Sequence, residues 1–252
     1  MQPWWRLVDL RPGLWPDLLS LSPALAETVA RGVVASATPA ILLRTQAPYV
    51  LLGPKDRRLP TLERAVNWLR TQELPAVFRL GGGSAVLLDG GCLSFAVVRP
   101  SRDLTAWQGN FIQMTEGVLR GLRRLGLAVE FGEAPGSYCP GAYDLLLEGK
   151  KIAGVAQAIR GGYAMVSGMI LVNQDPMATT TLLQEFYARA GDDRRLSPDA
   201  VTRLDAAIDV TIDQVFDALV SGFGELHNLH PLALSPHERL LAERLYRERT
   251  LA

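Results

Sequence analysis

Apolar positions in the first half of the chain switch repeatedly between helical and strand spacing. Ser22 and Pro23, an N-cap followed by a first-turn proline, open a helical pattern at residues 25–30. Thr61 is expected to cap a second helical pattern at 62–69. Helices that alternate with short apolar runs predict an α/β protein.

Short apolar runs between glycine and proline turns predict the strands. Residues 40–45 and 49–54, on either side of Pro48, are expected to form a hairpin, and a second hairpin is expected around Glu148-Gly149. Other strands are predicted at 76–80, 84–89, 92–98 and 163–173.

A long helix and an irregular loop interrupt these strands. The helical pattern from 104 to 125 ends at Gly126, a residue type that terminates helices in the left-handed conformation. The segment 132–142, GEAPGSYCPGA, holds three glycines and two prolines. It is therefore predicted to be a loop, and it carries Cys139.

From Thr179 onward the pattern becomes helical. Helices are predicted at 181–190, 198–208 and 210–223, and Ser235 with Glu238 forms a capping box before a last one. We therefore expect an α/β domain over residues 1–175 and a helical extension over 176–252 that packs on the same domain.

Composition narrows the function classes. Hydrophobic residues make up 48% of the chain and charged residues 21%, which is enough apolar material for a buried core. Lys+Arg 26 and Asp+Glu 26 give a net charge of 0, which disfavours nucleic acid as a partner. With no signal-peptide pattern and no apolar run near ~20 residues, we expect a cytoplasmic protein without a membrane span.

Cysteine and histidine are scarce. The two cysteines, Cys92 and Cys139, are too few for a disulfide framework or a structural zinc site. The three histidines, His227, His230 and His237, all lie near the C-terminal end of the sequence. We therefore expect neither a bound metal nor a cofactor.

Cys139 is the candidate nucleophile. Gly136, Pro140 and Gly141 shape the loop around it, whereas Cys92 opens an apolar strand and is expected in the core. A nucleophilic thiol must ionise, which requires a nearby cation or base, and lysine is the nearest candidate in sequence. Lys150 and Lys151 lie on a predicted strand, so at most one of them faces the site.

The run Arg79-Leu80-Gly81-Gly82-Gly83-Ser84 lets a ligand approach the backbone and can present N–H groups to an anion. It lacks the spacing of a P-loop and of the dinucleotide fingerprint. Taken alone, the run is better explained as a structural turn.

The three elements in this order resemble the lipoate/biotin protein ligase superfamily. RLGGGSAVLLD resembles its RRxGGGxAVxHD motif, and YDLLLEGKKIAGVAQ resembles its NDL…GxKxxGxAQ segment. GSYCPGAYDLLLEGKKIAGVAQ is similar to the cysteine-containing octanoyltransferase branch. The resemblance covers roughly residues 25–175.

The resemblance implies a lipoate–protein ligase-like mixed sheet flanked by helices, with the helical extension at its C-terminal end. It implies a ping-pong transfer of an octanoyl group from the glycine cleavage H protein, through a Cys139 thioester, to the lipoyl-domain lysine of E2 subunits. Lys151 would lower the thiol pKa and polarise the carbonyl. The residues implied in substrate binding are Arg79, Gly81, Gly82, Gly83, Ser84, Asp144, Gly154 and Gln157.

Two departures bear on the alternatives. Leu88-Asp89 replaces the ligases' HD, and Ser167-Gly168 replaces their HG, which weakens the expectation of an ATP-dependent lipoate–protein ligase. An octanoyl-acyl-carrier-protein transferase and a non-catalytic binder of acylated carrier domains stay open. Intact Cys139 and Lys151 count against the binder.

Overall fold

Two β-sheets of unequal size form the framework of the protein. The structure is a computed structural model that describes residues 4–11 and 16–251. The larger sheet has the strand order β11-β1-β2-β6-β10-β9-β8-β7 and the smaller one β4-β3-β5. The strands are β1 (Trp4–Leu10), β2 (Ala40–Arg44), β3 (Tyr49–Leu52), β4 (Ala76–Phe78), β5 (Val86–Leu88), β6 (Cys92–Pro100), β7 (Glu130–Gly132), β8 (Asp144–Leu147), β9 (Lys150–Arg160), β10 (Tyr163–Leu171) and β11 (Asn228–Pro231).

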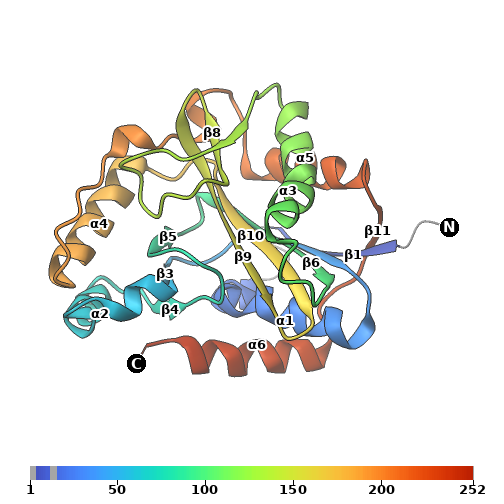
Figure 1. Ribbon diagram of the computed structural model, residues 1–252, viewed down its shortest axis with the longest axis horizontal. Helices are drawn as coiled ribbons and strands as arrows, with labels where there is room; N and C mark the ends of the chain where they lie inside the picture. Colours follow the sequence, from blue (N-terminus) through green and yellow to red (C-terminus); the bar gives the residue numbers. More distant parts are fainter. Residues whose placement is uncertain (1–3, 12–15, 252) are drawn as a thin grey trace.

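Three pairs of helices enclose these sheets (Figure 1). They are α1 (Ser22–Ser36), α2 (Leu62–Thr71), α3 (Trp107–Arg124), α4 (Pro176–Arg189), α5 (Ile212–Gly224) and α6 (Pro236–Arg249). Helices α3 and α5 cover one face of the large sheet, α1 and α6 pack together against the other, and α2 and α4 pack with the small sheet. The expected mixed sheet flanked by helices is confirmed. Within the described residues, no helix combines the length and hydropathy needed to cross a membrane.

The central strands are buried on both faces, which explains their continuous apolar runs. In β2, Ile41 and Leu43 join the core under α3 and α5, while Ala40 and Leu42 join the core against α1. Alternate side chains of a strand point to opposite faces, so one strand supplies both layers. A third core lies between the small sheet and α2 and α4, and it includes Cys92, as predicted.

The predicted hairpin over residues 40–54 is wrong. β2 pairs with β1 and β6 in the large sheet, whereas β3 pairs with β4 and β5 in the small one. The connection turns away because Gln46 is buried and donates hydrogen bonds to the carbonyl oxygens of Asp89 and Cys92, at 2.6 and 2.9 Å. The expected hairpin of β8 and β9 around Glu148-Gly149 is confirmed.

Local caps also differ from expectation. Leu21, not Ser22, is the N-cap of α1, and the Ser22 hydroxyl accepts a hydrogen bond from Arg44 Nε instead. Thr61 does occupy the N-cap of α2, but its hydroxyl donates to the carbonyl oxygen of Arg189. In both cases tertiary contacts take the hydroxyl that local capping would use.

The helix predicted at 198–208 is wrong as well. Two short 3-10 segments, Pro198–Ala200 and Leu204–Ala206, stand in its place. Between them Val201 forms a bridge with Lys151 of β9, and Thr202 N–H donates to the Lys151 carbonyl oxygen at 2.9 Å. Pairing with a strand removes these residues from helical geometry.

The segment after residue 175 combines helices with a strand. Besides α4, α5 and α6 it contributes β11, the edge strand of the large sheet, which pairs in parallel with β1. Arg6 of β1 forms an ion pair with Glu238 at 2.6 Å, and Ser235 and Glu238 form the expected capping box of α6. These contacts join the C-terminal helices to the large sheet.

Glycines allow α3 and α5 to pack closely, and this contact gives a prediction for stability. A Cβ on Gly222 of α5 would collide with the backbone of Gly117 and Gly121 of α3, whereas a Cβ on Gly224 would meet nothing within 4 Å. Gly222→Ala is expected to lower the free energy of unfolding in urea by about 1–3 kcal/mol. Gly224→Ala should leave it unchanged or raise it by up to ~1 kcal/mol. Equal effects of the two variants would contradict this packing.

Candidate active site

Cys139 lies on the loop between β7 and β8, as expected. Its backbone has φ +49°, in the left-handed region that non-glycine residues rarely adopt, and Gly136 nearby has φ +85°. Unusual backbone conformations of this kind concentrate at functional sites. The loop thus holds the partly exposed thiol in a defined position.

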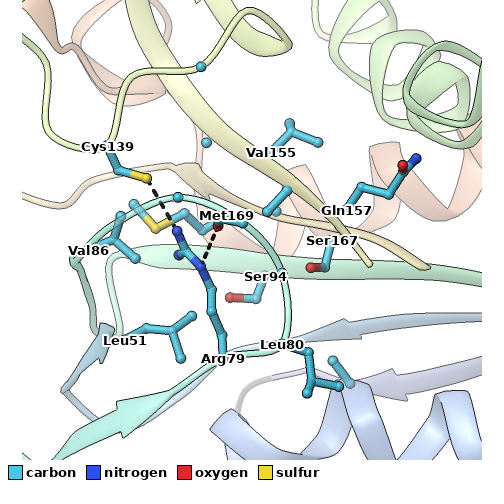
Figure 2. A pocket seen from close by; sticks show the side chains of 18 of the residues that line it. Leu51, Arg79, Leu80, Val86, Ser94, Cys139, Val155, Gln157, Ser167 and Met169 are labelled. Atoms are coloured by element: carbon cyan, nitrogen blue, oxygen red, sulfur yellow. Dashed lines mark hydrogen bonds between the residues drawn. The ribbon is translucent and has the colours of Figure 1, made fainter. Parts of the chain in front are cut away.

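Two donors contact the Cys139 sulfur, and Figure 2 shows one of them, Arg79. Nη2 of Arg79 lies 3.2 Å from Sγ, and the backbone nitrogen of Ser84 lies 3.1 Å from it. Both donors come from the glycine run, which connects β4 to β5. The cation at the sulfur is therefore an arginine, whereas sequence reasoning identified a lysine as the nearest candidate.

These contacts favour the ionised thiol. Burial raises the pKa of Cys139, but the charge of Arg79, then that of Lys151, and the Ser84 N–H together lower it below its usual value. Cys92 differs, because burial raises its pKa far above the ordinary range. Only the thiolate attacks a carbonyl carbon efficiently, so the environment distinguishes Cys139 as the reactive cysteine.

Lys151 binds the backbone of the Cys139 loop. It is fully buried on β9, while Lys150 is exposed, as the strand alternation predicts. Nζ of Lys151 lies 2.8 Å from Oδ2 of Asp144, 2.8 Å from the Cys139 carbonyl oxygen and 3.1 Å from that of Tyr138. The ammonium thus binds the backbone of the cysteine and acts on the sulfur through its charge.

Asp144 completes this support. Its carboxylate pairs with Lys151 and accepts backbone hydrogen bonds from Gly141 at 2.9 Å and Val155 at 3.2 Å. A buried charge pair is tolerated where further hydrogen bonds satisfy it, as here. Gly154 adjoins the pair, since a Cβ there would lie 3.4 Å from Lys151 Nζ. The carboxylate therefore links the C-terminal part of the Cys139 loop to β9.

Arg79 orders the glycine run around the sulfur. Its Nε donates to the Gly82 carbonyl oxygen at 3.0 Å, and Nη2 donates to that of Ser84 at 2.9 Å. Gly83 has φ +98°, and a Cβ on it would lie 2.6 Å from Sγ of Cys139. Glycine is thus required at this position by both conformation and space.

A second buried network behind the run was not foreseen from the sequence. The Tyr187 hydroxyl accepts a hydrogen bond from Ala85 N–H at 2.9 Å and donates to Asp56 at 3.2 Å. Asp56 in turn accepts from Gly53 N–H at 2.8 Å. Tyr187 is distant in sequence, in a stretch that reads simply as an amphipathic helix, so no local signal indicated it.

A cavity of about 400 Å³ extends from Cys139 between the large sheet, the small sheet and α1. The size is typical of small-molecule sites. Its walls are largely apolar, with Leu51, Phe78, Leu80, Val86, Phe95, Val155, Met165 and Met169, and Ser94 and Ser167 also line it (Figure 2). Gly81 and Gln157 also line it, and the Gln157 side chain donates to the Trp107 carbonyl oxygen at 3.0 Å. All the site residues proposed from the sequence except Ser84 line this cavity, and Ser84 contacts the Cys139 sulfur through its backbone nitrogen.

The described residues contain no cluster of three or more histidine, cysteine, aspartate or glutamate side chains that could hold a metal ion. His227 stacks on Trp5 and His230 packs against Trp4, both at the β1–β11 edge of the large sheet. These two histidines take part in edge packing. The chemistry available at the site is that of an activated thiol beside a cation.

Substitution of two neighbouring glycines tests this geometry. Gly83→Ala forces a Cβ against Sγ of Cys139 and Nη2 of Arg79, so the sulfur should lose its donors and its pKa should rise. Alkylation of Cys139 by iodoacetamide at pH 7 should slow by about tenfold, equivalent to one pKa unit. Gly82→Ala is the matched control, because nothing lies within 4 Å of a Cβ there. Equal slowing of alkylation in both variants would refute the close contact of Gly83 with the Cys139 sulfur and the Arg79 guanidinium.

Comparison with known proteins agrees with this site. Residues 20–224 match the family described as the lipoyl protein ligase A/B catalytic domain. The chain is 33% identical to octanoyl-[GcvH]:protein N-octanoyltransferase of Geobacillus kaustophilus, over 86% of this chain and 81% of that protein. It is 27% identical to lipoyl-[GcvH]:protein N-lipoyltransferase of Listeria monocytogenes, over 88% of this chain and 85% of that protein.

Solved structures extend the similarity to the fold. The chain is similar to the crystal structure of lipoate-protein ligase A bound with ATP, with 26% identity and a TM-score of 0.76, over 98% of this chain and 95% of that one. The family match spans most of the residues that build the sheets and the cavity. The chain therefore belongs to the family of lipoyl protein ligase A/B catalytic domains.

Proposed function

We propose that this protein transfers an octanoyl group from the octanoylated glycine cleavage H protein, GcvH, to the lipoyl-domain lysine of E2 subunits, through a thioester on Cys139. The observation that carries the proposal is the Cys139 thiol, bound by Arg79 and Ser84 N–H at one end of an apolar cavity. Relatives named octanoyl-[GcvH]:protein N-octanoyltransferase support the donor.

In the first step the Cys139 thiolate attacks the carbonyl carbon of the octanoyl-lysine amide. The C–S bond forms, the C–N bond breaks, and the lysine nitrogen leaves with a proton that replaces the one the thiol lost on ionisation. Arg79 lies where it can stabilise both the thiolate and the negative charge that develops on the carbonyl oxygen. The octanoyl chain occupies the apolar cavity.

In the second step the lysine amine of the E2 lipoyl domain attacks the thioester carbonyl carbon. The C–N bond forms, the C–S bond breaks, the thiolate is restored, and the proton lost by the amine balances the one gained by the first lysine. A thioester is reactive enough to acylate an amine, so two attainable steps replace one difficult transamidation. No cofactor enters either step.

Lys151 and Asp144 act as positioning residues in this proposal. Their ion pair, 2.8 Å long and buried, fixes the Cys139 carbonyl oxygen. The residues proposed from the sequence for catalysis and substrate binding all lie between 79 and 157, which supports an acyltransferase domain over 1–175 with 176–252 as an extension packed on it. The reduced thiol that the mechanism needs fits a cytoplasmic location.

An ATP-dependent ligase is the second candidate, favoured by the similarity to a ligase bound with ATP. Leu88 and Ser167 stand where the ligase motifs carry histidine, and both line the cavity. Their side chains offer fewer polar contacts to an acyl-adenylate. An octanoyl-acyl-carrier-protein donor is distinguished from GcvH by the assay below.

The proposal predicts that the protein transfers octanoyl from octanoylated GcvH to an apo E2 lipoyl domain in the presence of EDTA and without ATP. Intact-mass spectrometry of the acceptor domain measures this transfer. Cys139→Ser should slow transfer by at least about a thousandfold, because the nucleophile is lost. Cys92→Ala, the matched control in the core, should keep activity and cost at most roughly 1 kcal/mol of stability. An absolute need for ATP would favour the ligase, and transfer from octanoyl-acyl carrier protein alone would refute the donor.

A further inference from the structure

Charged residues line the cavity where α1 and α6 meet it. Glu27 of α1, Arg44 of β2 and Arg249 of α6 all line it. In Figure 2 Cys139 lies at the top of the cavity, and Leu80 lies toward α1 at the bottom. Figure 1 shows α6 beneath α1, at the lower edge of the molecule. The cavity, whose walls are largely apolar, therefore has a charged wall where α1 and α6 meet it.

An ion pair between two helices forms this end. Nη2 of Arg249 lies 2.6 Å from Oε2 of Glu27, and their side chains are 22% and 8% exposed. The other carboxylate oxygen of Glu27 pairs with Arg31 of the same helix at 2.7 Å. Glu27 thus keeps Arg31 as a partner when Arg249 is substituted. The Arg249–Glu27 pair can therefore be tested without leaving a buried carboxylate unpaired.

Arg44 adds a second charge at the same end. Its side chain is buried, and Nε donates to the Ser22 hydroxyl at 2.6 Å. Across the described part of the chain, no hydrogen-bond partner reaches the buried Nη1 atom of Arg44. An apolar group packed against this atom would leave its charge without a hydrogen-bond partner in an apolar environment.

The end of α6 is itself held in place. Leu251 N–H donates to the Ala76 carbonyl oxygen at 2.9 Å, and Thr250 forms a bridge with Val77 of β4. Arg249 is therefore anchored beside the cavity on one side by the small sheet and on the other by Glu27.

We propose that the Arg249–Glu27 ion pair, together with Arg44, is the closed end of the acyl cavity and sets the longest acyl chain that Cys139 accepts. The inference rests on the proposed acyl transfer and adds a function for α6. A chain that fits between Cys139 and the pair is buried among apolar side chains. A longer chain must displace Arg249 or bury methylenes against unsatisfied charge, and both are unfavourable.

The test uses p-nitrophenyl octanoate and p-nitrophenyl dodecanoate, which need no carrier protein. The Cys139 thiolate attacks the ester carbonyl carbon, the C–S bond forms, the C–O bond breaks and p-nitrophenolate leaves with the electron pair. In a cavity without an end, each added methylene would favour binding by about fourfold. The wild type is instead expected to be acylated by dodecanoyl ester at least ~10-fold more slowly than by octanoyl ester.

Arg249→Ala should raise the ratio of dodecanoyl to octanoyl acylation by at least ~10-fold, because the cavity then opens beyond α6. Arg247→Ala is the matched control, since Arg247 is exposed on the same helix and is not among the residues that line the cavity. It should leave the ratio as in the wild type. Intact-mass spectrometry measures the ratio of dodecanoyl to octanoyl acylation. A change in thiol reactivity affects the reaction with both esters equally, so it does not change this ratio.

Ala26→Leu provides a test of opposite sign and covers the case in which Arg249→Ala does not fold. Ala26 lines the cavity from α1, one residue before Glu27, so a larger side chain shortens the cavity. The ratio of octanoyl to hexanoyl acylation should fall by about fivefold or more.

Three results would overturn the inference: a dodecanoyl-to-octanoyl ratio in Arg249→Ala equal to that of the wild type, an octanoyl-to-hexanoyl ratio in Ala26→Leu equal to that of the wild type, or no acylation of Cys139 by either the octanoyl or the dodecanoyl ester. Failure of the proposed function is distinguishable, since it would appear as a wild type that reacts with the esters according to length but does not move octanoyl groups from GcvH to a lipoyl domain.

Discussion

The contact between the Cys139 sulfur and the Arg79 guanidinium is the constraint on which the rest of the site depends. The two residues are 60 positions apart, and the partial burial of Cys139 by itself opposes ionisation of its thiol. A cation and a backbone N–H must therefore meet the sulfur at hydrogen-bond distance. The glycine run supplies both donors. Gly83 allows the run to approach the Cys139 loop closely because it has no side chain.

The fold brings these segments together by placing a small sheet against a large one. The glycine run connects two strands of the small sheet, whereas the Cys139 loop and Lys151 belong to the edge of the large sheet. The space between the separate hydrophobic cores is the acyl cavity. The two ends of the cavity differ in their chemistry. The Cys139 thiolate lies near Arg79 at one end, and in our proposal the ion pair of Glu27 with Arg249 closes the other end and limits the length of the acyl chain.

Much of this could be predicted from the sequence, and the failures have physical causes. The loop of Cys139, the alternation of Lys150 and Lys151 and the burial of Cys92 follow from local patterns. The contact of Arg79 with the sulfur could not be predicted by position, since only the packing of two sheets brings it there. The false hairpin at 40–54 and the false helix at 198–208 have the same origin. Pairing with distant strands decided their conformation, and short apolar runs carry no information on their partners.

The most direct test of the account is the pKa of Cys139, measured from the pH dependence of iodoacetamide alkylation in the wild type, Arg79→Met, Lys151→Met and Lys150→Met. Arg79 and Lys151 lower this pKa, so removing either should move the alkylation midpoint to higher pH, by about 1–3 units for Arg79, whose guanidinium contacts the sulfur. Lys150→Met should leave the midpoint unchanged. A midpoint in Arg79→Met equal to that of the wild type would contradict the claim that this arginine holds Cys139 as a thiolate.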